Sequence, residues 1–225
     1  MTIEEKARND LFEEWRDASL LLKAQTGIQT VETFKLLESV YDSNRYYHNF
    51  NHVIAVMEKF GEIRGNSSVE DFPAKDGAEA VAAVMLHDSF YDTKIRDSSN
   101  VVISCQIARS MGFGDRVVQM ICATEHKNVD YEGKGEISVD AVHDADLALF
   151  ADDYQQVWND CLNVRQEWSH VPLKAFISGR VEIIRKFINR SRIFNTEYGQ
   201  DVWEERARKN MKKEIDDLRE GKLRL

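Results

Sequence analysis

Apolar residues recur along most of the chain at intervals of three and four, which is the spacing of one face of an α-helix. The first stripe consists of Leu11, Trp15, Ala18 and Leu22. Thr2 and Glu5 precede it with the spacing of a capping box, which is typical of a helix start. The next stripe begins after Thr30 and consists of Phe34, Leu37 and Tyr41. Over the whole chain the pattern predicts helices at residues 2–27, 31–41, 48–65, 78–90, 98–111, 115–126, 139–150, 153–169, 173–194 and 203–219.

Signals for β-strands are weak. The sequence has only two prolines, Pro73 and Pro172, and its Asp-Gly pair at 76–77 does not join two alternating segments. The stretch at 78–90 is apolar on nearly every side, which predicts a helix buried among others. The longest loops are short enough for a compact domain. We therefore expect an all-α protein in which residues 1–225 form a single-domain helical bundle.

Composition narrows the classes of function. Of the 225 residues 43% are hydrophobic and 31% charged, and the net charge is -9. No cluster of Lys and Arg stands apart from acidic residues, so a nucleic-acid duplex is not an expected partner. The chain has no apolar stretch long enough to span a membrane and no secretory signal, so we expect a cytoplasmic protein with no membrane partner. Cys105, Cys122 and Cys161 form no CxxC pair, which argues against a thiolate metal site.

Two places in the sequence combine histidine with other chemically active residues. His48 and His52 are four residues apart in RYYHNFNH, so on a helix they would face the same side. His87 and Asp88 stand together near the end of the apolar 78–90 helix. Buried ionisable residues are costly unless they are paired or bind a metal, although a His-Asp hydrogen bond would also satisfy them.

Two further places lie in the second half of the chain. His126 ends the predicted helix at 115–126. In VHDADLALF, Asp146 enters an apolar run and His143 lies three residues earlier, on the same helical face. Asp144 is rotated away from that face, and we expect it to cap a helix or to support a neighbouring group.

The order H...HD...D resembles the HD-domain superfamily, in which these residues converge on metal from separate helices. Further similarity to the predicted metal-dependent phosphohydrolase group of that superfamily extends over most of the chain, in RYYHNFNH, AVMLHDSFYD, ATEHK, DADLALF, VRQEW, FISGR and ERARKNM. The resemblance implies that the metal ligands are His52, His87, Asp88 and Asp146.

The element YHNxxH also resembles cyclic-nucleotide phosphodiesterases, which implies that His48 donates a proton to the leaving group. One departure from the phosphohydrolase pattern is Val101, which stands where a glutamate is expected between the matching residues Asn100 and Ser104. Asp97 is the nearest substitute for that carboxylate. Another departure is Trp168, which stands where tyrosine is expected.

The activity implied is metal-assisted hydrolysis of a phosphate ester in a nucleotide or another small phosphorylated molecule, with His48 and Asp88 as catalytic residues. Imidazole and carboxylate ligands suit Mn, Fe, Ni, Co or Zn, with Mg as a further candidate, and the open positions of an octahedral ion suit catalysis better than a closed zinc site. Arg45, His126 and Lys127 are the candidates for holding the substrate, Arg45 being the first choice for the phosphate.

Two other functions remain open at this stage. The same ligand order serves di-iron oxygenases, in which His126 and His143 would complete a second metal position. Alternatively, the bundle could be a non-catalytic module that binds a nucleotide or a metal. The sequence identifies neither the substrate nor the oligomeric state.

Overall fold

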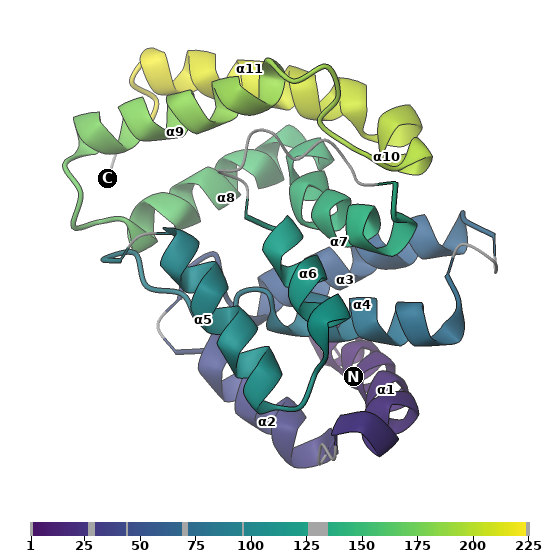
Figure 1. Cartoon of the computed structure of the whole chain (residues 1–225). Helices are drawn as coiled ribbons and strands as arrows, with labels where there is room; N and C mark the ends of the chain where they lie inside the picture. The colour runs from purple at the N-terminus through teal and green to yellow at the C-terminus, as the bar shows by residue number, and fades with distance from the viewer. Residues whose placement is uncertain are drawn as a thin grey trace.

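The computed structural model of the chain is built from helices (Figure 1). It describes residues 2–26, 30–43, 45–68, 72–95, 97–125 and 135–223, and within these ranges it contains no β-strand, which confirms the all-α prediction. The helices are α1 (Ile3–Thr26), α2 (Thr30–Tyr41), α3 (Phe50–Gly65), α4 (Ala74–Leu86), α5 (Asp97–Ser110), α6 (Asp115–Ala123), α7 (Ile137–Leu147), the 3-10 helix η1 (Ala148–Ala151), α8 (Tyr154–Glu167), α9 (Leu173–Ile188), α10 (Glu197–Val202) and α11 (Glu204–Arg219).

Helix α4 lies at the centre of the molecule. It packs against α1, α3, α5, α6 and α7, and every residue from Gly77 to Leu86 is buried. Ala80, Ala82 and Ala83 are fully buried, and their small side chains leave room for neighbouring helices on several sides of α4. The sequence-based prediction of a buried helix is therefore confirmed, although the helix begins at Ala74, directly after Pro73, and ends at Leu86 rather than at residue 90.

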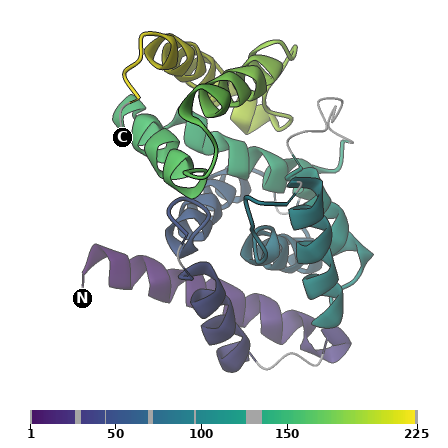
Figure 2. The same ribbon diagram turned by 90° about the vertical axis from the view of Figure 1, so that its left-hand side faces the viewer.

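The N-terminal helices and the C-terminal helices lie at opposite ends of the molecule (Figure 2). The capping box of α1 is confirmed, since the Thr2 amide donates to Glu5 and the Glu5 amide donates to the Thr2 hydroxyl. The predicted apolar stripes of α1 and α2 are buried. These stripes belong to a contiguous apolar core that extends from α1 to α11.

Helix α3 begins two residues after His48, so the prediction that His48 and His52 share a helix is wrong. Asn49 is the N-cap of α3, and its side-chain oxygen accepts hydrogen bonds from the amides of Asn51 and His52. The capping bonds stop the helix from extending backward through His48. His52 consequently lies in the first turn of α3, and His48 lies in the connection that leads into it.

The predicted helix at 173–194 ends at Ile188. Glu204 of α11 accepts the amides of Ile193 and Phe194, and Arg208 donates to the carbonyls of Ile188 and Arg190. These contacts from α11 satisfy backbone groups that a longer helix would have paired internally. The short helix α10, which the sequence pattern did not predict, follows this segment. Among the described residues, no helix combines the length and the apolar composition that crossing a bilayer requires.

Candidate metal centre

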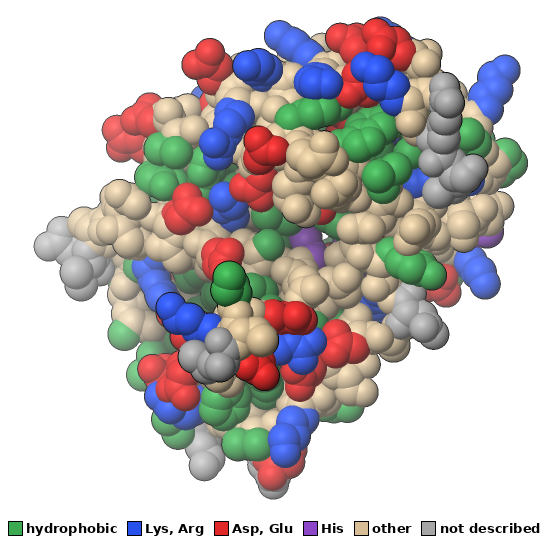
Figure 3. All heavy atoms as spheres, turned by 180° about the vertical axis from the view of Figure 1, so that it is seen from behind, with side chains coloured by type: hydrophobic (Ala, Val, Ile, Leu, Met, Phe, Trp, Pro, Cys, Tyr) green, Lys and Arg blue, Asp and Glu red, His purple; other side chains and the backbone are tan. Residues whose placement is uncertain are grey.

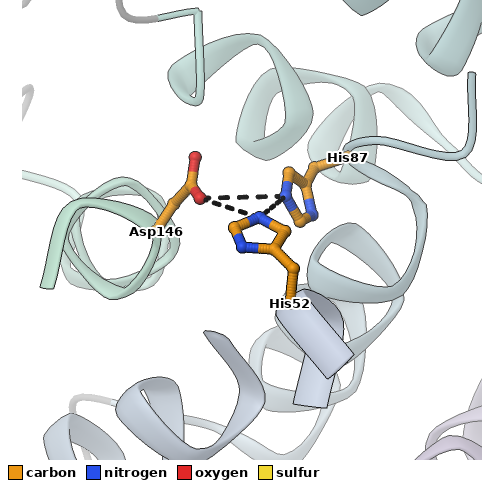
Figure 4. Close-up of side chains that lie close together, drawn as sticks. All are labelled: His52, His87 and Asp146. Carbon is orange, nitrogen blue, oxygen red and sulfur yellow. Dashed lines mark hydrogen bonds and ion pairs between the residues drawn. The ribbon is translucent and has the colours of Figure 1, made fainter. Parts of the chain in front are cut away.

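Three helices bring two histidines and an aspartate together. His52 belongs to the first turn of α3, His87 directly follows α4, and Asp146 is the penultimate residue of α7. Figure 4 shows their side chains pointing toward one another. The His52 Nε2 atom is 3.2 Å from His87 Nε2 and 3.3 Å from Asp146 Oδ1, and His87 Nε2 is 3.8 Å from the same oxygen.

Asp88 adds a second carboxylate to this cluster. Its Oδ2 atom lies 3.2 Å from His87 Nε2 and 3.7 Å from His52 Nε2. Donor atoms around one ion with bonds of about 2.1 Å are about 3.0 Å apart at neighbouring octahedral positions and about 3.4 Å apart in a tetrahedron. His52, His87 and Asp146 thus come together with separations and a donor chemistry that fit a divalent transition metal, and Asp88 lies against the two histidines of this group.

A hydrogen bond on the side of the ring away from the cluster fixes the orientation of His87. Its Nδ1–H donates to the Val84 carbonyl at 2.8 Å, so in the neutral ring Nε2 carries the lone pair and faces the cluster. Burial opposes protonation of His87, but the carboxylates of Asp88 and Asp146 outweigh burial and raise its pKa to about 9. Burial lowers the pKa of His52 despite the contact with Asp146. Burial would raise the pKa of Asp88, yet His87 holds it well below its usual range.

Glu167 anchors the connection that carries His48. One carboxylate oxygen accepts the backbone amides of Tyr46, Tyr47 and His48 at 2.7 to 3.0 Å, and the other lies 2.7 Å from His48 Nδ1. Burial opposes ionisation of Glu167, but the bonds from His48 and the backbone lower the pKa of its carboxyl group. In the sequence VRQEW is only a point of resemblance, and nothing there indicates this role of its glutamate.

The His48 ring lies beside the cluster, with its centroid 5.7 Å from that of His52. On one face it stacks against Tyr91 at a centroid distance of 3.7 Å. Trp168 donates from Nε1 to the Tyr91 hydroxyl at 3.3 Å, so the residue that departs from the expected tyrosine helps to hold the stacking partner of His48. The stack and the Glu167 bond together fix the His48 ring.

Arg45 contacts backbone rather than presenting an open guanidinium group. It donates to the carbonyls of His48 at 3.2 Å, Asp88 at 2.6 Å and Ser89 at 3.3 Å. These bonds join the connection before α3 to the segment after α4. The structure therefore gives Arg45 a role in holding the cluster together, which competes with the phosphate-binding role expected from the sequence.

His143 and Asp144 contact the loop before α10 and do not belong to the group formed by His52, His87 and Asp146. The Asp144 carboxylate is fully buried and accepts the amides of Asn195 and Thr196 and the Thr196 hydroxyl, while His143 Nδ1 lies 2.9 Å from it. Because Asp144 lies inside α7, the expectation that it caps a helix is wrong. The expectation that it supports a neighbouring group is closer to its role.

Asn100 and Ser104, the two residues of α5 that match the phosphohydrolase pattern, hold the segment after Asp88. Asn100 bonds both the amide and the carbonyl of Asp92, and Ser104 bonds the backbone of Phe90. Val101, between them, packs against the apolar core. The side chain of Asp97 lies outside the described residues, as do His126 and Lys127.

Seen from behind, the molecule has a hollow in which a histidine side chain is visible (Figure 3). A separate cavity of about 570 Å³ lies between α1 and α2, and none of the cluster residues lines it. Within the described ranges, the group of three or more potential ligands with donor atoms within 4.8 Å of one another is His52, His87 and Asp146. Comparisons of the chain with protein-family models, curated proteins and solved structures gave no match.

Proposed function

We propose that this chain is an HD-type, metal-dependent phosphohydrolase that acts on a nucleotide or another small phosphorylated molecule. The observation that carries the proposal is the convergence of two imidazoles and two carboxylates from His52, His87, Asp88 and Asp146, with the His48–Glu167 pair beside them. The motif order in the sequence supports the same proposal.

His52, His87, Asp88 and Asp146 would hold one divalent ion, and the two positions that they would leave open on an octahedral ion favour Mn, Fe, Co or Ni over a closed tetrahedral zinc site. When bound, such an ion supplies a nucleophilic water at neutral pH and polarises a phosphoryl oxygen. His87 contributes an Nε2 lone pair that its bond to Val84 has already oriented. Arg45 holds the backbone of Asp88 close to that of His48 by donating to both carbonyls.

His48 would donate the proton that the leaving alkoxide requires. Its Nδ1 is committed to Glu167, so Nε2 is the nitrogen that can deliver a proton. Stacking on Tyr91 keeps the ring from rotating out of position. Binding of the substrate phosphate by Arg45, His126 or Lys127 remains part of the proposal.

The primary test combines elemental analysis of the purified protein with a phosphate-release screen in Mn, Co, Ni, Fe and Mg. We expect about one metal per chain and turnover with at least one metal. Asp146→Asn should lose both metal and turnover, whereas Asp115→Asn, at an exposed position of α6, should keep both. An Asp146→Asn protein with full metal content would refute the ligand assignment.

A second test separates the two histidines. His52→Ala should release the metal, while His48→Ala should retain it and lose turnover by roughly 10²- to 10⁴-fold. Asn51→Ala, which alters an exposed side chain in the same turn of α3 as His52, is the control and should keep both metal and turnover. Two equivalents of iron with oxygen consumption would instead favour the di-iron oxygenase, and tight nucleotide binding without turnover in any metal would favour a binding module.

A further inference from the structure

Two of the three cysteines lie in contact across the α5–α6 interface. The sulfur atoms of Cys105, on α5, and Cys122, on α6, are 3.5 Å apart. These helices follow one another in the chain and pack side by side (Figure 1). Because an S–S bond of about 2.05 Å requires only a modest approach of the two sulfurs, this pair is placed for a disulfide.

The two thiols differ in accessibility. Cys122 is exposed to solvent, whereas Cys105 is 7% exposed. The hydrogen bond with Cys122 raises the pKa of Cys105, and burial raises it further. Because Cys122 is accessible, a soluble oxidant would react with its thiolate first. Cys105 then lies next to the oxidised Cys122 sulfur.

We infer that Cys105 and Cys122 form a reversible disulfide on exposure to a peroxide. The Cys122 thiolate attacks one peroxide oxygen and becomes a sulfenic acid as the O–O bond breaks and the other oxygen leaves as water after protonation. The Cys105 sulfur then displaces the sulfenic hydroxyl, which also leaves as water. Two thiols lose two electrons and two protons, the peroxide is reduced to two waters, and a small thiol reverses the reaction by exchange.

The position of the pair connects it to the candidate metal centre. Ser104, the residue before Cys105, bonds the backbone of Phe90 in the segment that follows Asp88. A disulfide would link α5 covalently to α6 across the short connection between the two helices. The modification site itself does not depend on the proposed phosphohydrolase activity.

The test treats the reduced full-length protein with hydrogen peroxide at neutral pH, followed by denaturation, alkylation and peptide mass spectrometry. We expect the number of alkylatable thiols to fall from three to one, a Cys105–Cys122 linked peptide to appear, and dithiothreitol to restore all three thiols. Cys161→Ala removes the remaining buried cysteine and should leave the linked peptide unchanged.

Cys105→Ser should leave Cys122 without its partner, so a dimedone adduct should accumulate there several-fold above the wild-type level. Cys122→Ser should form neither the linked peptide nor the adduct. If Cys105→Ser fails to fold, Cys105→Ala serves the same purpose. Oxidation of the wild-type protein to a stable Cys122 sulfinic acid, to a dimer joined through Cys122, or to no product at all would overturn the inference.

Discussion

The two aspartates at the end of α7 lie close in sequence but face different surroundings. Asp146 faces the imidazoles of His52 and His87, whereas the fully buried Asp144 accepts bonds from the loop at Asn195 and Thr196. The first carboxylate is placed for a ligand, and the second joins two parts of the fold. Substitutions at these positions should therefore have different consequences.

Asp144→Asn should lower the free energy of unfolding by about 2 to 4 kcal/mol, because an NH₂ group would face buried N–H donors where an oxygen now accepts. Urea denaturation measures the change. Asp153→Asn is the control, since Asp153 caps α8 and asparagine caps equally well. A loss of less than 1 kcal/mol in Asp144→Asn would show that the loop contributes little to stability.

Glu167→Gln should keep the metal and lower kcat by about tenfold or more, with a smaller effect on KM. Glu167 acts through His48, so the reason is the loss of its hold on the His48 ring and not of a contact with substrate. Steady-state kinetics of the double variant His48→Ala/Glu167→Gln should then match His48→Ala alone. Additive losses would mean that Glu167 acts independently of His48.

The proximity of His52, His87 and Asp146 could be predicted from the sequence, because the order of these residues and their neighbours form a recognisable pattern. Glu167 could not, because it is 119 residues from His48 and its local sequence gives no sign of what its carboxylate contacts. Asp144 was misjudged for the same reason, since Asn195 and Thr196 are about 50 positions away. The periodicity of a sequence indicates which face of a helix a residue occupies. It does not indicate which distant backbone groups the side chain will bond.

At the scale of elements, the start of α3 determines where the two histidines of YHNFNH lie. Asn49 ends the preceding connection by capping the helix, which leaves His52 on α3 and His48 on the loop held by Glu167. An asparagine before an apolar run is a cap signal, so this boundary was available from the sequence. The end of α9 was not, because Glu204 and Arg208 of α11 supply the bonds that replace a longer helix.

Asn49→Ala should lower the free energy of unfolding by about 1 kcal/mol, because two amides of the first turn of α3 lose their acceptor. Chemical denaturation measures this change. The control is Asn51→Ala, at an exposed position of the same turn, which should change stability by less than about 0.5 kcal/mol. Equal effects in the two variants would contradict the capping role of Asn49.

At the scale of the whole molecule, the candidate ligands come from three helices that are far apart in sequence. His52, His87 and Asp146 are drawn from α3, the end of α4 and α7, and α4 and α7 both pack against α3. A bound ion would join these helices and add to the stability of the folded state in proportion to the logarithm of its concentration above Kd. The centre and the fold should therefore respond together to any condition that weakens metal binding.

Low pH should weaken metal binding, because protons compete with the metal for His87. In the metal-free protein its pKa is raised to about 9, so at neutral pH a proton occupies the Nε2 atom that the metal requires. Metal binding must displace this proton. The apparent affinity for the metal should therefore rise as pH rises, and each unit of pH below 9 should lower it about tenfold. Above pH 9 the ring is already neutral, and the dependence should end.

Titration with Co or Ni between pH 6.5 and 8.5 should thus show an affinity that rises about tenfold per pH unit, with nearly one proton released per metal bound. Calorimetry in buffers of different ionisation enthalpy measures the release directly. Asp144→Asn, where it folds, should release the same proton, because Asp144 bonds the Asn195 loop and is not one of the carboxylates that raise the His87 pKa. Affinity that is independent of pH, with no proton released, would show that His87 is neutral before the metal arrives, and the carboxylates around it would then not dominate its charge.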